Sequence, residues 1–298
     1  MITGFAADAL LGDPRRGHPV ALFGTAAAAL ERRLWADSKP RGAGYAALCV
    51  GAATGLGVAA QAATRRRPFA RFALTAAATW IVLGGRGLAA EGTEMARLLE
   101  SGDVPGARKR LSHLCARDAT GLDSAELARA ATESIAENTS DAVVAPLFWG
   151  AVGGIPGLLG YRALNTLDAM VGYRSPRYAR FGWASARADD VANLVPSRIG
   201  AVLTTVSAPL VGGRVRRAWR VWRRYGALHP SPNAGQVEAA FAGALDVRLG
   251  GTNSYGGRAE RRGTLGEGRA PETADLRRAV RLSTVVGVAA AAAVAVTR

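Results

Sequence analysis

The sequence predicts an all-α protein: a polytopic helical membrane protein with helical and loop-rich polar segments between short membrane helices. Three observations lead to this prediction. Of the 298 residues, 49% are hydrophobic and the mean hydropathy is +0.08, although the formal net charge is +15. The charged residues are absent from several long windows. No run alternates apolar and polar residues for long enough to predict a strand. We therefore expect one integral-membrane domain over residues 1–298.

Five windows without a charged residue are the predicted membrane helices: 42–64, 72–85, 142–161, 199–213 and 282–297. A helix needs roughly 20 apolar residues to cross a bilayer, and about 17 at the short end. The shorter windows cross only if the arginines at their ends extend to the lipid headgroups. The alternative is that these alanine-rich windows are buried helices of a soluble protein. Residues 1–12 lack the basic start of a signal peptide, so we expect a further short membrane helix there.

Polar segments separate these windows, the main ones at about 86–141, 162–198 and 214–281. The first is expected to be helical, with Asp123 or Ser124 capping a helix that runs to about Asn138. Within the last, the glycine-rich residues 250–268 are expected to form a loop.

The positive charge comes almost entirely from arginine, since only Lys39 and Lys109 are lysines. A basic chain suggests either a nucleic-acid binder or a membrane protein with charged loops, and the uncharged windows favour the second. Residues 214–225 combine arginines with Trp and Tyr in an amphipathic pattern that suits nucleic acid or an anionic membrane surface. Because this stretch directly follows window 199–213, we favour the membrane surface. We expect contact with membrane lipid and no nucleic-acid partner.

The first group of candidate functional residues is Glu133, Glu137 and Asp141, which are four residues apart and share one face of a helix. Three like charges destabilise a helix unless a cation compensates them. Mg²⁺ is one such cation, because it is bound by one or two carboxylates together with substrate phosphates. The alternative is a solvated acidic face neutralised by Arg129 and other arginines. The adjacent membrane-length window favours a functional role.

A second polar group lies between residues 161 and 193, beside the same window. It contains Asn165, Asp168, Arg187, Asp189, Asp190 and Asn193. The last four have spacings that place them near one another on a helix. Amides, carboxylates and a guanidinium at this density indicate a polar site. The alternative is a soluble loop held by salt bridges.

Two further motifs are less specific. Residues 229–235 and 250–257 contain glycines that let backbone N–H groups approach phosphate oxygens, but they lack the Gly-Lys-Ser/Thr of a Walker loop. A flexible loop explains them equally well. Asp13 and His18 form the other motif, and a lone His before a proline is more often structural than catalytic.

In order along the chain, these motifs resemble the CobD/CbiB family of cobalamin biosynthesis, the adenosylcobinamide-phosphate synthases. The matching strings are LGDP at 11–14, HPV at 18–20, ESIAEN at 133–138, APLF at 145–148, NTLDAMVGY at 165–173, FGW at 181–183, ARADDVAN at 186–193, PSPN at 230–233 and GGTNSYG at 250–256. No single string is decisive, whereas the ordered set is highly specific and covers nearly the whole chain. One departure is Ala142, where the family often has glycine.

The resemblance implies a multi-pass enzyme of the cell (inner) membrane. Such enzymes join aminopropanol, free or as its O-phosphate, to a propionate carboxylate of adenosylcobyric acid, with ATP as the expected energy source. Forming an amide from a carboxylate requires a good leaving group, which phosphorylation supplies, and that step calls for Mg²⁺ ligands and cationic groups on phosphate. The supply of ATP argues that the active side is cytoplasmic. Protein partners, and whether the amine is phosphorylated, stay open.

Within this resemblance each candidate residue receives an expected role. The expected catalytic residues are Glu133, Glu137, Asp168, Arg187 and Asp190. The expected metal ligands are Glu137, Asp141, Asp189 and Asp190. The expected substrate-binding residues are Asp13, His18, Asn138, Arg162, Asn165, Arg174, Asn193, Asn233, Asn253 and Tyr255. The alternative function is a polytopic membrane transporter without ATP turnover.

One window raises a question of chain direction. The Glu133 group precedes window 142–161 and the Asn165 group follows it, so a straight crossing would separate the two groups. Residues 153–157 read Gly-Gly-Ile-Pro-Gly, which disfavours a continuous helix. We therefore expect a hairpin of two half-helices, which is tolerated at membrane depth only where protein shields it.

Overall fold

The computed structural model describes residues 1–14, 17–173, 175–255 and 258–296, with residues 253–255 and 258–261 described by their backbone only. The chain divides into two compact units. The first comprises Met1–Gly84, Ala145–Asn193 and Ala291–Arg298, and the second comprises Gly85–Val144 and Leu194–Ala290. The expectation of a single domain is not tested by this division.

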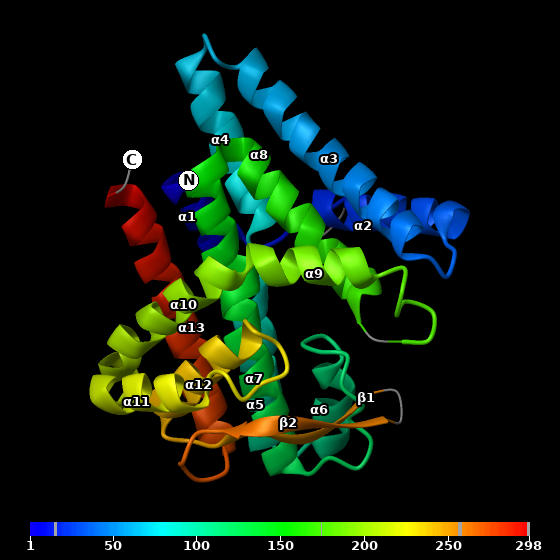
Figure 1. The fold of residues 1–298 in the computed structure, drawn as a ribbon. Coiled ribbons are helices and arrows are strands. Elements are labelled where there is room, and N and C mark those ends of the chain that lie inside the picture. The colour runs from blue at the N-terminus through cyan, green and yellow to red at the C-terminus, as the bar shows by residue number, and fades with distance from the viewer. Residues whose placement is uncertain (15–16, 174, 256–257, 297–298) are drawn as a thin grey trace. The chain divides into compact units, whose positions relative to one another are not determined.

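The first unit is helical (Figure 1). Its elements are α1 (Ile2–Leu11), α2 (Pro19–Leu34), α3 (Lys39–Ala63), α4 (Pro68–Val82), α8 (Ala145–Leu167), the π-helical turn η2 (Asp168–Gly172) and α9 (Trp183–Ala192). The second unit contains α5 (Gly85–Glu100), α6 (Val104–Leu111), α7 (Ser124–Thr139), the π-helical turn η1 (Ser140–Val144), α10 (Leu194–Ser207), the 3₁₀ turn η3 (Ala208–Val211), α11 (Val215–Tyr225), α12 (Ala234–Leu245), strands β1 (Leu249–Tyr255) and β2 (Arg258–Leu265), and most of α13 (Thr273–Val296).

Five helical stretches are long and apolar enough to cross a membrane, and each contains all or most of one predicted window. They are Lys39–Ala63, Pro68–Glu100, Ser124–Gly172, Leu194–Val211 and Thr273–Val296. The predicted fold class, a polytopic helical membrane protein, is confirmed. The N-terminal helix α1 is apolar but shorter, as expected for residues 1–12.

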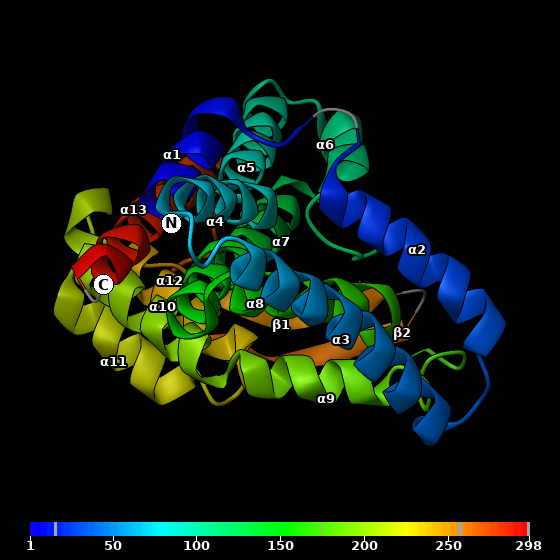
Figure 2. The same ribbon diagram turned by 90° about the horizontal axis from the view of Figure 1, so that it is seen from above.

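Helix α8 reverses direction where the sequence predicts a break (Figure 1). Gly154 has φ 64° and ψ −143°, a backbone conformation that favours glycine, and Pro156 follows it. A Cβ on Gly150 would lie 2.9 Å from Cδ2 of Leu158. In a continuous helix, residues eight apart are separated by about 12 Å. The two arms of α8 therefore pack against each other, which confirms the predicted hairpin. Helix α3 packs beside it (Figure 2), with Gly57 against Pro156.

Helix α7 forms the centre of the second unit. Asp123 caps its start with a capping box, in which Glu126 Oε2 accepts from the Asp123 N–H at 3.0 Å and Asp123 Oδ1 accepts from the Glu126 N–H at 2.8 Å. This confirms the predicted cap. Further along, Gly92 of α5 packs on Ile135, and α12 packs on the same helix. The polar residues of α7 are consequently held inside this unit.

The expectation that residues 250–268 form a loop was wrong. Strands β1 and β2 pair as an antiparallel hairpin, with Leu249 opposite Leu265 and an irregularity between Leu249 and Gly251. Both leucines are buried. Backbone pairing and this buried leucine pair hold the strands together, neither of which requires the apolar–polar alternation that predicts strands from sequence.

Candidate functional site

The centre of the second unit is a buried carboxylate, Glu133 of α7, which is only 2% exposed. Arg117 Nη2 donates to its Oε2 at 2.5 Å, and Arg129 Nη1 lies 3.3 Å from its Oε1. The Gly250 N–H donates to the same Oε1 at 2.7 Å, while Arg129 donates to the Gly250 carbonyl oxygen. Glu133 is therefore fully compensated by cations and does not belong to a solvated acidic face.

Gly250 reaches Glu133 because it has no side chain. Its φ is 79°, and a Cβ at this position would collide with the Gly263 carbonyl oxygen. The glycines of this motif thus shape a backbone donor for a carboxylate of α7. The sequence had suggested a backbone donor for phosphate, and the same kind of N–H group here serves a protein anion.

More charge surrounds Glu133. Glu137 lies one turn along α7 and interacts electrostatically with Arg262, Arg117 and Glu133. Glu238 of α12 is 1% exposed, and among the described residues neither of its carboxylate oxygens has a hydrogen-bond partner. Burial, followed by the charges of Glu133 and Glu137, raises the pKa of Glu238 well above its usual range.

His229 lies beside Glu238, with 3.9 Å between Nε2 of His229 and Oε1 of Glu238. Its Nδ1 accepts from the Ser231 N–H at 3.0 Å. Burial and then the positive charge of Arg262 lower the pKa of His229 to about 4, so the imidazole is neutral at pH 7. The same loop supplies buried Asn233, whose Oδ1 accepts from Ser197 Oγ and Arg198 Nη1, each at 3.2 Å. Asn233 thus holds the loop on α10.

A polar groove of about 450 Å³ adjoins this cluster in the second unit. Its lining includes Arg129, Arg248, Gly251, Thr252 and Glu126. The guanidinium of Arg248 beside an open glycine backbone suits an anionic group of a ligand, although Asp123 and Glu126 also line the groove.

A second cluster lies in the first unit and is centred on Asp189 of α9, which is 8% exposed. Asn193 Nδ2 donates to its Oδ2 at 2.9 Å, and Tyr161 Oη donates to Asn193 Oδ1 at 2.9 Å. The other carboxylate oxygen, Oδ1, is buried and has no hydrogen-bond partner among the described residues. A buried carboxylate oxygen of this kind calls for a donor or a cation.

The raised pKa of Asp189 is consistent with a missing hydrogen-bond donor or cation. Burial, followed by the negative charge of Asp168, raises its pKa from 3.8 to about 7, while the Asn193 and Asn165 side chains oppose the shift. Asp168 lies in η2, where its carboxylate occupies the space that a Cβ on Gly172 would fill. Two neighbouring carboxylates with one unsatisfied oxygen fit a divalent cation.

Other predicted residues lie on α8 and α9 of the first unit, and one lies in the second unit. Arg187 Nη1 is 3.3 Å from Oδ2 of Asp190, in a pair more exposed than Asp189. Asn165 and Arg162 lie on α8, about one and two turns before Asp168, and Arg162 is half-buried. The predicted metal ligand Asp141 lies in η1 of the second unit and is half-buried. Asp141 and Asp168 both stand in π-helical turns, which occur frequently at functional sites.

The remaining predicted residues have local contacts or lie outside the description. His18 Nδ1 accepts from the Val20 N–H at 3.2 Å and caps α2, and its Nε2 lies 3.7 Å from Oδ1 of Asp13. Asn138 Nδ2 donates to the Ser134 carbonyl oxygen at 2.9 Å. Arg174 lies outside the described residues. Asn253 and Tyr255 belong to β1, and only their backbone is described.

Among the residues that the structure describes, no three His, Cys, Asp or Glu side chains are grouped so that they hold a metal ion by themselves. An all-protein cage is therefore not present in that part of the chain. Mg²⁺ commonly uses one or two carboxylates and completes its shell with water and phosphate oxygens, which the Asp168–Asp189 pair can accommodate.

Sequence reasoning missed several members of the second-unit cluster, above all Glu238, Arg117 and Arg262. One signal was available for Glu238, because it is the only charged residue of α12, an otherwise apolar helix. Arg117 precedes α7 by several residues and Arg262 belongs to β2, so only the fold brings them to Glu133 and Glu137.

Comparisons with known proteins show the family of the chain. A family model described as CobD/Cbib protein matches residues 1–283. The chain is 56% identical over 292 residues to a cobalamin biosynthesis protein CobD of Mycobacterium tuberculosis, which covers 98% of this chain and 92% of that protein. It is 45% identical over 272 residues to a protein of the same name from Geobacter metallireducens, covering 90% and 86%. The corresponding protein of Rhodobacter capsulatus is 39% identical over 303 residues, covering 95% and 91%. No solved structure matches this chain.

Proposed function

Because the chain belongs to the CobD/CbiB family of cobalamin-biosynthesis proteins, we propose that it forms an amide bond at the expense of ATP. The bond joins the amine of aminopropanol, or of its O-phosphate, to a propionate carboxylate of adenosylcobyric acid. The product is adenosylcobinamide or its phosphate. Beyond the family itself, the observation that carries this proposal is the buried Asp189 carboxyl beside Asp168, with one oxygen left unsatisfied.

The reaction needs an activated carboxylate, because an oxide ion is too poor a leaving group for an amine to displace. In the proposed sequence the propionate oxygen attacks the γ-phosphorus of ATP and ADP leaves. The amine nitrogen then attacks the acyl carbon, phosphate leaves, and the nitrogen gives up a proton. Each amide formed therefore consumes one ATP.

Residues of the first unit suit the phosphoryl-transfer step of this proposal. Asp168 and Asp189 would hold Mg²⁺, which when bound neutralises charge on the phosphate oxygens. Asn193 and Tyr161 fix the direction of the Asp189 carboxylate. Arg162 and Arg187 are the proposed cationic groups for phosphate. Asp190 keeps Arg187 in place through their ion pair.

Residues of the second unit suit substrate binding. Arg117, Arg129 and the Gly250 N–H hold Glu133 rigidly at the side of the polar groove. The groove then offers Arg248 to an anionic group such as a phosphate, beside Arg129, which Glu133 and the Gly250 carbonyl oxygen already engage. Neutral His229 accepts from the Ser231 N–H through Nδ1, so its Nε2 carries the proton and faces the buried Glu238 carboxyl without adding charge.

The decisive experiment uses the full chain, purified and returned to lipid. Adenosylcobyric acid, aminopropanol phosphate or aminopropanol, ATP and Mg²⁺ are supplied, and the amide and ADP are measured by mass spectrometry. We expect stoichiometric amide and ADP. Asp189→Asn and Glu137→Gln should abolish turnover, whereas Glu272→Gln, a change at an exposed carboxylate, should not.

Two results would contradict the proposal. One is the absence of amide although all substrates bind. The other is near-normal turnover by both Asp189→Asn and Glu137→Gln. If the protein instead moves corrinoid across vesicle membranes without consuming ATP, the transporter function replaces the enzyme.

We further propose that the motif-bearing segments face the cytoplasm, where ATP is available. Single cysteines at exposed Thr120 and Ala179, in a chain lacking Cys49 and Cys115, test this. An impermeant thiol reagent should label both from the cytoplasmic side. Labelling of either from the opposite side would refute the orientation.

A further inference from the structure

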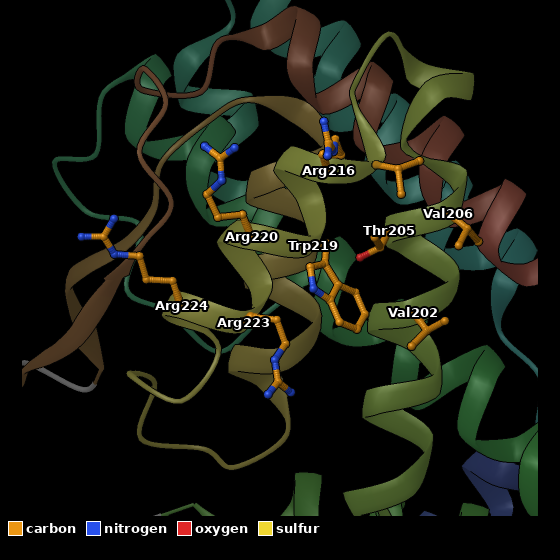
Figure 3. A pocket seen from close by; sticks show the side chains of 9 residues that line it. Val202, Thr205, Val206, Arg216, Trp219, Arg220, Arg223 and Arg224 are labelled. Atoms are coloured by element: carbon orange, nitrogen blue, oxygen red, sulfur yellow. The ribbon is translucent and has the colours of Figure 1, made fainter.

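We propose that a groove between α10 and α11 binds the headgroup and upper acyl chain of an anionic phospholipid. The groove has a volume of about 910 Å³ and lies within the second unit. Figure 3 shows its two kinds of wall, with Val202 and Val206 on one side, arginines on the other and the indole of Trp219 between them.

The arginine wall follows from the amphipathic pattern of α11. Ala218, Val221 and Trp222 are buried, and Trp222 Nε1 donates to Gln236 Oε1 of α12 at 3.0 Å. This face fixes α11 on the protein. The opposite face carries Arg216, Arg220 and Arg223, whose spacing of four and three residues brings them to one side of the helix.

These three guanidinium groups are available to an external anion. Among the described residues no carboxylate lies within ion-pair distance of Arg216, Arg220 or Arg223, and no acidic residue lines the groove. In contrast, Arg217 pairs with Asp246, and Arg224 pairs with Glu267 at 2.8 Å. Arg224 also lines the groove but is neutralised by Glu267, whereas Arg216, Arg220 and Arg223 have no carboxylate partner among the described residues.

The apolar wall identifies the kind of anion. Val206 is 54% exposed and Val202 41% exposed, on a helical stretch, Leu194–Val211, that is long and apolar enough to cross a membrane. Trp219 is 49% exposed, and tryptophan favours the headgroup level of a bilayer. A free phosphate or a nucleic-acid strand would leave the valines in water. A phosphodiester that carries acyl chains satisfies both walls, and the stretch that contains α10 is long and apolar enough to lie in lipid.

The test compares lipids that share acyl chains but differ in charge. The purified full chain is incubated with phosphatidylglycerol and phosphatidylcholine, and retained lipid is counted by native mass spectrometry. We expect preferential retention of phosphatidylglycerol. Replacing Arg216, Arg220 and Arg223 together by Gln should weaken this retention at least tenfold, since one basic residue near a membrane surface contributes roughly a fivefold effect.

A matched control removes the same charge elsewhere. Arg65, Arg66 and Arg67 are exposed and join α3 to α4, so the corresponding triple Gln variant should retain phosphatidylglycerol to within about twofold. Brominated phosphatidylglycerol should quench tryptophan fluorescence of the parent chain more than brominated phosphatidylcholine does. This difference in quenching should disappear in a Trp219→Phe variant.

Four outcomes would overturn the proposal. Equal retention of the two lipids, or equal loss in the two triple variants, would show that the groove does not select an anionic lipid. Displacement of the lipid by glycerol phosphate at equal concentration would indicate a simple anion site. Displacement by ATP, together with a higher KM for ATP in the groove variant, would assign the groove to nucleotide.

Discussion

Replacing Asp189 by Asn should stabilise the protein while it abolishes turnover. In the folded chain the pKa of Asp189 is raised from 3.8 to about 7 by burial and by Asp168. The unfolded carboxyl ionises as the pH rises above 3.8, whereas the folded one stays protonated until about pH 7. The free energy of unfolding therefore falls across this interval, and the loss is complete above pH 7.

The size of the effect follows from the shift. Three pKa units correspond to about 4 kcal/mol of destabilisation at pH 8, of which about 2 kcal/mol is already present at pH 5. Asparagine has nearly the same shape and does not ionise. The variant should match its parent near pH 4 and exceed it by up to about 4 kcal/mol at pH 8. Such a gain is typical where function retains an unfavourable group.

The measurement is reversible unfolding in mixed micelles at pH 4, 5 and 8, with and without Mg²⁺. Mg²⁺ should stabilise the parent at pH 8 and have little effect on Asp189→Asn. Asp190→Asn is the matched control, because the neighbouring carboxylate is less buried and already paired with Arg187. A variant that is no more stable than its parent at pH 8 would refute the reasoning about Asp189.

Three further outcomes test other parts of the structure. Gly154→Ala should cost about 1–2 kcal/mol because its φ is 64°, whereas Gly153→Ala, with open space around its Cβ, should be neutral or stabilising in the same unfolding titration. Arg117→Ala should cost about 3–5 kcal/mol by leaving Glu133 without its buried partner, while Arg97→Ala in an exposed pair should change stability little. Lowering the pH from 6.5 to 5 should reduce the free energy of unfolding by about 2 kcal/mol through His229. Its folded pKa of about 4 keeps the folded imidazole neutral, while the unfolded imidazole binds a proton. The His229→Gln variant should not show this reduction.

Local patterns in the sequence were sufficient for the helices. The windows without charge became membrane-length helices because apolar length is itself the requirement for crossing a bilayer. Asp123, one of the two predicted caps, does cap α7, since a capping residue and its N–H partner lie within one turn. The break at residues 153–157 was equally local, because glycine and proline act on the backbone where they stand. The hairpin β1–β2 was missed because its strands are held by long-range backbone pairing rather than by alternation.

The candidate site depended on both levels. The sequence by itself singled out Glu133, Glu137, Asp168 and Asp189, since acids at helical spacing beside apolar windows are costly unless something compensates them. Only the tertiary structure decided what compensates each one. Arg117 and the Gly250 N–H reach Glu133 from distant segments, so Glu133 is structurally neutralised. Asp189 receives Asn193 on one oxygen and has Asn165 and the Asp168 carboxylate nearby, while its other oxygen has no hydrogen bond among the described residues. The ordinary charge of a side chain is known from the residue type alone. The solvation and the neighbours of that side chain depend on how helices far apart in the chain pack together.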